Sequence, residues 1–185
     1  DGKDSLEEIS GIAYRTGDKI IHNGWRELMD LSEIPFVYEH LEKFENRIIY
    51  YESSRGCPFS CSYCLSSIDK KLRFRDLELV KKELQFFLDH RVPQVKFVDR
   101  TFNCKHEHAM TIWKYILEHD NGVTNFHFEI SADLLREEEM ELMSQMRPGL
   151  IQLEIGVQST NPETIRAIHR HMDLKKLEHC VNRVH

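Results

Sequence analysis

The amino-acid sequence predicts an α/β fold, a partial TIM-like (β/α) barrel of about four parallel units that follows an N-terminal arm. From residue 47 onward, short runs rich in β-branched and aromatic residues alternate four times with amphipathic, helix-like segments. This alternation is typical of a parallel sheet with covering helices, either closed as a barrel or open and doubly wound. Polar residues follow each run, at the strand ends where both kinds of fold place their chemistry.

The four units are defined by the spacing of their apolar residues. In the third run, Phe126, Phe128 and Ile130 alternate with His127 and Glu129, which is the period of a strand with two different faces. The expected strands are residues 48–54, 94–98, 125–131 and 150–157, and the helices that follow them are residues 76–91, 106–119, 134–146 and 161–171. Asn161 and Pro162 open the last helix as its N-cap and first helical position.

Residues 1–46 are expected to form the N-terminal arm and linker, and residues 47–185 the partial barrel. In the arm, apolar residues flank a turn at Thr16-Gly17-Asp18, which indicates a β-hairpin. Short amphipathic pieces around Pro35 are expected to pack on the body. The first residue is not Met and the chain ends in a helix-like segment, so we expect both ends to be cut from a longer protein. Four units would leave a sheet edge exposed, through which self-association is expected.

Composition excludes several classes of protein. With 41% hydrophobic and 30% charged residues, the 185-residue chain can bury a core. No apolar run approaches the roughly 20 residues that cross a bilayer, and no secretory signal opens the chain, so a cytoplasmic protein without membrane contact is expected. A net charge of −6 disfavours nucleic acid as a partner, because that interaction needs an excess of Lys and Arg.

Three of the five cysteines, Cys57, Cys61 and Cys64, lie within eight positions in the stretch CPFSCSYC. Five is an odd number, and clustered thiols in a cytoplasmic chain indicate metal or redox chemistry rather than disulfides. The spacing C-x-x-x-C-x-x-C supplies three thiolates and leaves a fourth coordination position open. It therefore favours an iron–sulfur cluster, whose fourth iron can bind a small molecule.

Two other interpretations of the cysteines remain. A zinc site needs four ligands, so it would have to recruit Cys104 or a histidine. Three unrelated buried cysteines are disfavoured because Gly56 and Pro58 mark a turn, and the loop offers little apolar surface to bury. Cys104 and Cys180 themselves are best explained as small packing residues.

The stretch RGCPFSCSYC, residues 55–64, resembles the signature of the radical S-adenosylmethionine (radical SAM) superfamily, with Tyr63 in the aromatic position before the last cysteine. The resemblance implies a full or partial (β/α) barrel and a [4Fe–4S] cluster bound by Cys57, Cys61 and Cys64. It also implies that the unique iron holds S-adenosylmethionine. An external donor supplies an electron, reductive cleavage gives a 5′-deoxyadenosyl radical, and this radical acts on a substrate that the sequence does not identify.

A wider set of segments resembles the radical domain of the subgroup that carries a cobalamin-binding domain. These segments are YYESSRGCPFSCSYCLSS, VKFVDRTFN, NFHFEISADLL and LIQLEIGVQST. The resemblance implies that residues 1–46 follow such a domain in the parent protein. The chain has no D-x-H-x-x-G stretch, so cobalamin is implied for the full-length parent only.

The resemblance also implies cofactor-binding residues beyond the cysteines: Tyr63, Asp99, Glu129, Ser131, Gln158 and Arg170. Glu129 and Gln158 would contact the methionine and ribose parts of S-adenosylmethionine. Arg170 would pair with its carboxylate, a role that suits a guanidinium. The family's Gly-Gly-Glu turn after the second strand is replaced here by Asp99-Arg100-Thr101, and Asp99 is the candidate for the amino group.

Each of these assignments has a simpler alternative. Glu129 and Glu154 could be ordinary barrel carboxylates paired with a nearby Arg, and Arg170 could lie on a solvated helix end. The basic residues Lys70, Lys71, Arg73 and Arg75 could form a solvated face or neutralise an anionic substrate. For the whole chain, the alternatives to a radical SAM enzyme are an iron–sulfur electron carrier and a structural zinc domain. The isolated fragment is expected to be inactive.

Overall fold

The computed structural model describes residues 5–184, and the chain divides after Asp30 into two compact units. In the first unit, β1 (Ala13–Thr16) and β2 (Lys19–His22) pair antiparallel. Thr16 pairs with Lys19, so Gly17 and Asp18 form a two-residue turn, and Gly17 has the positive φ of 57° that such turns require. A 3-10 turn, η1 (Leu6–Glu8), precedes the hairpin. The predicted hairpin is confirmed.

The second unit is built on a parallel sheet with the strand order β3-β6-β7-β8. The strands are β3 (Ile49–Tyr51), β6 (Gln94–Phe97), β7 (Asn125–Ile130) and β8 (Ile151–Ile155). Each lies inside one of the four runs that the sequence predicts as strands. Consecutive strands are neighbours, as expected when each β/α unit adds its strand beside the preceding one. The predicted α/β class and the parallel sheet are confirmed.

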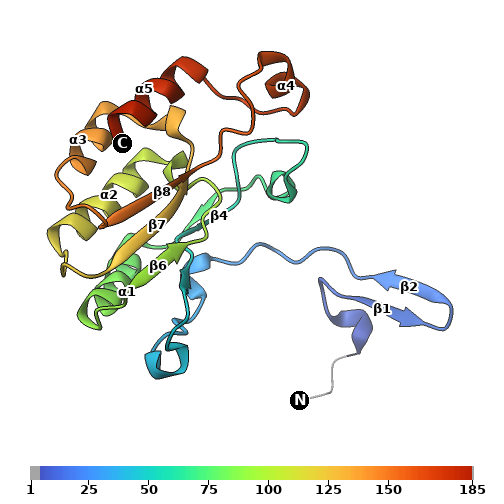
Figure 1. Ribbon diagram of the computed structural model, residues 1–185. Coiled ribbons are helices and arrows are strands. Elements are labelled where there is room, and N and C mark those ends of the chain that lie inside the picture. Colours follow the sequence, from blue (N-terminus) through green and yellow to red (C-terminus); the bar gives the residue numbers. More distant parts are fainter. Residues whose placement is uncertain (1–4, 185) are drawn as a thin grey trace. The chain divides into compact units, whose positions relative to one another are not determined.

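Helices cover one face of this sheet (Figure 1). They are α1 (Leu77–Asp89), α2 (His106–Glu118), α3 (Glu137–Met143) and α5 (Leu174–Val184). Between them and the sheet lies an aromatic core in which Phe97, Phe102, Trp113 and Phe128 are completely buried. None of the helices in the described part of the chain combines the length and apolar character needed to cross a bilayer.

Two of the expected helices are shorter in the structure. The third begins at Glu137 rather than near residue 134, because the Glu139 carboxylate accepts a hydrogen bond from the Arg136 N–H (2.9 Å) and fixes the helix start there. Residues Ala132–Leu134 form a separate 3-10 turn, η6. The fourth helix, α4 (Pro162–Ala167), starts as predicted, with the Asn161 side chain accepting from the Glu163 and Thr164 amides.

The opposite face of the sheet is polar. Tyr50, Lys96 and His127 occupy neighbouring positions across β3, β6 and β7, and Glu129 pairs in register with Glu154 of β8. Lys96 Nζ lies 3.1 Å from a Glu154 carboxylate oxygen and 3.9 Å from one of Glu129. The period-two pattern of the third strand therefore separates an aromatic face, covered by helices, from a charged face.

Residues 31–46 pack against the body through aromatic contacts, as the sequence indicates. They form two 3-10 turns, η2 (Leu31–Glu33) and η3 (Leu41–Phe44). The ring of Phe36 lies 5.1 Å from that of Phe86, and the Tyr38 hydroxyl donates to the Tyr50 carbonyl (2.6 Å). Pro35 disfavours helical backbone at the residue before it, which limits the length of η2.

A buried ion pair joins this segment to the sheet and to α1. Arg75 donates two hydrogen bonds to the Glu83 carboxylate, at 2.7 and 2.8 Å, and a third to the Ile34 carbonyl. The Tyr51 hydroxyl donates to the same carboxylate (2.6 Å). Both charged side chains are buried, so each depends on the other for its neutralisation.

Replacing Arg75 should therefore destabilise the fold strongly. We expect Arg75→Met to lower the free energy of unfolding by about 3–5 kcal/mol, because it leaves the Glu83 carboxylate buried without a counter-charge. The control is Lys81→Met, which removes an exposed ion pair with Glu78 and should leave the free energy of unfolding close to that of wild type. If both variants lose the same free energy of unfolding in urea denaturation, the Arg75–Glu83 pair does not stabilise the fold as described.

Candidate functional site

A pocket of about 220 Å³ lies at the carboxyl ends of the strands. It is enclosed by the ends of β6, β7 and β8 and by the loop that carries Cys57, Cys61 and Cys64, called here the cysteine loop. Its lining includes eight of the nine residues that the sequence analysis assigned to metal or cofactor: Cys57, Cys61, Tyr63, Cys64, Glu129, Ser131, Gln158 and Arg170. The ninth, Asp99, does not line it. Residues up to 113 positions apart in sequence are thus brought to one site, since Cys57 and Arg170 share it.

The cysteine loop is closed at its base by two short strands. β4 (Ser54–Arg55) pairs antiparallel with β5 (Arg73–Phe74), and the Cys57 amide donates to the Asp69 carbonyl (3.0 Å). Gly56, between β4 and the first cysteine, has φ +97°, and a Cβ there would lie 2.6 Å from the Lys71 carbonyl oxygen. This position needs glycine both for its backbone conformation and for the space it leaves.

Hydrogen bonds inside the loop fix the cysteines relative to one another. The Cys64 amide donates to the Cys61 carbonyl (3.1 Å), and the Ser67 hydroxyl donates to the Cys64 carbonyl (2.7 Å) at the turn η4 (Leu65–Ser67). The Ser62 amide donates to the Ile168 carbonyl (2.9 Å), which ties the loop to the end of α4. The loop is therefore held from its base and from its tip.

The basic run beside the loop is divided among separate partners. Arg75 is buried against Glu83, Arg73 pairs with Asp69, and Lys70 donates to the Ser60 hydroxyl (2.7 Å). These residues therefore hold the loop and its neighbouring helix rather than forming one continuous cationic face.

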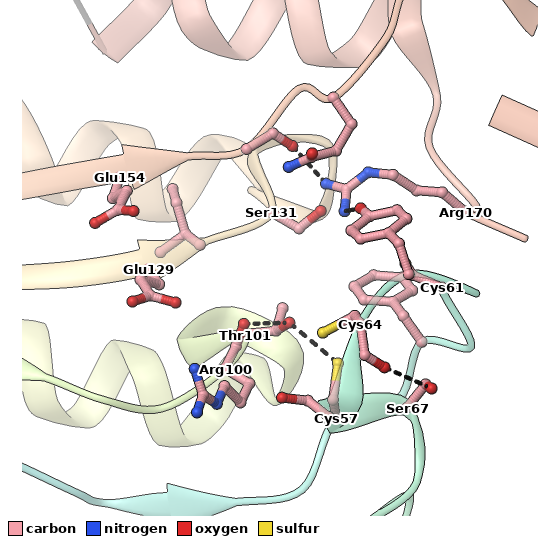
Figure 2. Close-up of a pocket in the computed structure, with 16 residues that line it drawn as sticks. Cys57, Cys61, Cys64, Ser67, Arg100, Thr101, Glu129, Ser131, Glu154 and Arg170 are labelled. Carbon is pink, nitrogen blue, oxygen red and sulfur yellow. Dashed lines mark hydrogen bonds between the residues drawn. The ribbon is translucent and has the colours of Figure 1, made fainter. Parts of the chain in front are cut away.

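The three cysteines of the loop all line the pocket. All five cysteines of the chain are free; Cys57 and Cys61 are buried, whereas Cys64 is half-buried. Figure 2 shows the Cys57 and Cys64 sulfur atoms at the loop side of the cavity. Across residues 5–184, no three His, Cys, Asp or Glu side chains converge closely enough to hold a single metal ion.

Neither of the other cysteines belongs to this pocket. Burial, reinforced by the nearby charges of Asp99 and Cys57, raises the pKa of the Cys104 thiol to about 11. Cys180, a residue of α5, is completely buried in the core. Cys104, by contrast, is half-buried and lies outside that core.

Arg170 forms the wall beside the cysteine loop. Its guanidinium donates to the Gly156 carbonyl at 2.6 Å, and a second nitrogen lies 3.5 Å from the Tyr63 hydroxyl (Figure 2). The Nε atom of Arg170 is buried and has no hydrogen-bond partner within the described chain. Gln158 follows on the same strand end, in a positive-φ conformation (65°). A buried donor without a partner suits an anionic group bound in the pocket.

Glu129 and Glu154 form the opposite wall (Figure 2). Their cationic neighbour is Lys96, whereas the simpler alternative named an arginine as the partner. Glu154 also lies 3.2 Å from His127 Nε2. Burial and the charge of Lys96 lower the pKa of His127, so this imidazole is neutral near pH 7.

Asp99 lies behind the pocket, where its carboxylate is completely buried. It accepts hydrogen bonds from the Ser53 amide (3.0 Å), the Ser53 hydroxyl (2.7 Å) and the Ser54 hydroxyl (2.6 Å). Burial raises the pKa of Asp99 to about 6, against the lowering effect of these hydrogen bonds. The structure thus gives Asp99 internal partners and places it away from the cavity.

Arg100 and Thr101 are among the pocket residues that were not assigned a role from the sequence. The Thr101 hydroxyl lies 3.6 Å from Cys57 Sγ and donates to the Arg100 carbonyl (2.9 Å). The available signal was their position directly after the second strand. Asp99 shares that position, so the sequence could not show which of the three consecutive residues lines the pocket.

Comparison with known proteins places the chain among radical SAM proteins. The family model described as the radical SAM superfamily matches residues 51–185. The chain is 25% identical over 173 residues to an uncharacterized methyltransferase of Pyrococcus horikoshii, which covers 88% of this chain and 37% of that protein. It is 34% identical over 82 residues to a protein of Methanocaldococcus jannaschii named as a methylthiotransferase, covering 42% of this chain and 18% of the other.

A solved structure shares the fold. The radical S-adenosylmethionine methyltransferase TsrM from Kitasatospora setae, with cobalamin and a [4Fe–4S] cluster bound, superimposes with a TM-score of 0.75 at 15% identity. The match covers 97% of this chain and 39% of that one. The chain thus spans well under half the length of the relatives it matches.

The contact at Gly56 leads to a mutational prediction. Gly56→Ala should lower the free energy of unfolding by about 3 kcal/mol, because it combines a positive φ with a collision against the Lys71 carbonyl. Gly122→Ala is the control: Gly122 also has a positive φ (73°) but open space around it, so about 1 kcal/mol is expected. If the two variants unfold at the same denaturant concentration, the loop does not approach Gly56 as described.

Asp99 leads to a prediction about pH. Because its folded pKa of about 6 exceeds the unfolded value of about 3.9, the folded state holds the proton more tightly. The contribution of Asp99 to stability is therefore largest below about pH 4, and it falls as pH rises from about 4 to about 6. The free energy of unfolding of the wild type, minus that of Asp99→Asn, should therefore become smaller as pH rises across this window. If this difference instead becomes larger as pH rises, the raised pKa of Asp99 is contradicted.

Proposed function

The chain belongs to the radical SAM superfamily, and on this basis we propose that Cys57, Cys61 and Cys64 hold a [4Fe–4S] cluster beside a binding site for S-adenosylmethionine. Membership of the superfamily implies both cofactors. When bound, the cluster supplies the electron that breaks a sulfur–carbon bond of S-adenosylmethionine. The protein's own residues hold the cluster, bind the cosubstrate and keep water from the reaction.

The observation that carries this proposal is the position of the three thiols. They come from one loop, they are free, and all three line the same pocket at the strand ends. A cubane cluster takes each thiolate on a different iron, so its ligands surround the cluster instead of meeting at one point. The absence of a converging group of three ligands in residues 5–184 is compatible with this arrangement. A mononuclear zinc site would need such a group.

Arg170 fits the carboxylate of S-adenosylmethionine. Its guanidinium is held in place by the Gly156 carbonyl, and its buried Nε is left without a partner in the described chain. A guanidinium fixed in this way can bind a carboxylate with little loss of conformational freedom. Gln158 and Ser131 line the same pocket and are proposed to contact the cosubstrate beside Arg170.

The amino group of S-adenosylmethionine is better matched by Glu129 and Glu154 than by Asp99. Both glutamates line the pocket, whereas the Asp99 carboxylate already accepts hydrogen bonds from Ser53 and Ser54. The positively charged amino group would be stabilised by a carboxylate that reaches into the cavity. Lys96 lies close to the carboxylates of both Glu129 and Glu154, but its single charge cannot neutralise both.

For the reaction class, we propose transfer of a methyl group to a small-molecule or protein substrate. This proposal rests on relatives named methyltransferases. The solved relative binds cobalamin, which supports a cobalamin-binding domain in the full-length protein, with residues 1–46 as the segment that follows it. An external electron donor is the further partner that the proposed chemistry requires.

The proposal predicts which cysteines are needed for cluster assembly. After anaerobic reconstitution with iron and sulfide, the wild-type protein should hold about four irons and four sulfides and show the brown absorbance of a [4Fe–4S] cluster. Cys57→Ala should lose most of both. Cys104→Ala, which removes a nearby thiol outside the pocket, should keep the wild-type content.

Product analysis then tests the proposed reaction. With reductant and S-adenosylmethionine, the full-length protein should form 5′-deoxyadenosine and methionine, or S-adenosylhomocysteine where a methyl group is transferred, and its Cys57→Ala variant should form neither. A reconstituted cluster that never binds or consumes S-adenosylmethionine would favour the electron-carrier alternative. A colourless protein with one zinc and no sulfide would favour the structural zinc domain.

A further inference from the structure

We infer that Thr101 is a positioning residue for the metal centre, donating a hydrogen bond to the thiolate of Cys57 and thereby raising the reduction potential of the cluster. The inference rests on the proposed function, because it concerns the same cysteine. It adds a residue outside the cysteine motif, at a place where the sequence departs from the family pattern.

The contact lies inside the pocket, away from solvent. Thr101 Oγ1 and Cys57 Sγ are 3.6 Å apart, a distance suited to a hydrogen bond to sulfur, and both residues are buried (Figure 2). Both also line the pocket proposed to hold the cluster. A hydrogen bond in such surroundings is less screened than one at the surface.

The direction of this contact follows from the protons that the two groups carry. The Thr101 hydroxyl has one proton to donate, and two acceptors lie within its reach: the Arg100 carbonyl (2.9 Å) and Cys57 Sγ (3.6 Å). Iron would bind Cys57 as the thiolate, which has no proton, so in this contact the hydroxyl would be the donor and the sulfur the acceptor. Rotation about the C–O bond would direct the proton to the sulfur, and the hydrogen bond to the Arg100 carbonyl would be exchanged for a charge-assisted one.

Hydrogen bonds of the chain itself hold the two partners at this distance. Ser53 and Ser54 come shortly before Cys57, Asp99 comes shortly before Thr101, and hydrogen bonds to the Asp99 carboxylate join the two segments. The Thr101 carbonyl also accepts from the Cys104 amide (3.0 Å). The oxygen and the sulfur are thus placed by their backbones, so little reorganisation is needed when the cluster assembles.

The consequence concerns the ease of reduction. Reduction adds one negative charge beside the Cys57 sulfur, and a hydrogen-bond donor stabilises the more negative state more strongly. Hydrogen bonds to the sulfur atoms are among the factors that set cluster potentials. Removing the Thr101 hydroxyl should therefore make the cluster harder to reduce.

The test compares three variants of the reconstituted protein by redox titration monitored by electron paramagnetic resonance. Thr101→Val keeps the side-chain shape and removes the hydroxyl. We expect about a tenfold lower ratio of reduced to oxidised cluster at a fixed potential, a shift of about −59 mV for a one-electron couple. Thr101→Ser keeps the hydroxyl and should restore the wild-type potential. Thr111→Val, which removes an exposed hydroxyl on α2, is the matched control and should have no effect.

The outcomes separate this inference from the proposed function. If wild type assembles no cluster, the proposed function fails and takes this inference with it. If the cluster assembles and Thr101→Val keeps the wild-type potential, this inference alone is overturned. It is also overturned if the potential of Thr101→Ser shifts as far as that of Thr101→Val. Should Thr101→Val not assemble a cluster, Thr101→Ala replaces it under the same criteria.

Discussion

The site depends on one buried carboxylate that joins the ends of two neighbouring strands. Asp99, after β6, accepts three hydrogen bonds from Ser53 and Ser54, which connect β3 to the cysteine loop. Burying a carboxylate is costly, and the raised pKa of Asp99 expresses that cost, but the hydrogen bonds fix the base of the loop against the end of the second strand. Because of this connection, Cys57 faces Thr101 instead of moving with a free loop.

Similar contacts occur at the other strand ends, where side chains form hydrogen bonds with the backbone of a neighbouring element. The Asn103 side chain exchanges two hydrogen bonds with the Ser131 backbone, at 2.9 and 3.0 Å, and joins the ends of β6 and β7. Asp133 accepts from the Asp173 amide (3.2 Å) before α5. The aromatic core holds the strands parallel, while these polar contacts set the positions of the strand ends, where small displacements would matter for chemistry.

Much of this could be predicted from the sequence, and the exceptions have physical reasons. The four strands follow from apolar runs and the period-two pattern of residues 125–130, and the loop follows from the spacing of three cysteines. The role of Asp99 could not be predicted, because a polar residue after a strand has the same sequence pattern whether it faces the cavity or is buried behind it. Glu129 was expected in the pocket, but its neighbour Lys96 lies 33 positions earlier and is brought close only by strand pairing. The contact of Thr101 with Cys57 could not be predicted either, since it requires the base of the loop to be folded.

The central claim is that three thiolates hold a four-iron cluster with one iron left open for S-adenosylmethionine. Mössbauer spectroscopy of protein reconstituted with ⁵⁷Fe tests it most directly, because each iron contributes separately to the spectrum. The account predicts that adding S-adenosylmethionine changes the parameters of about one quarter of the iron and leaves the remainder as it was. A spectrum of isolated iron ions, or of a cluster in which no iron responds to S-adenosylmethionine, would contradict it.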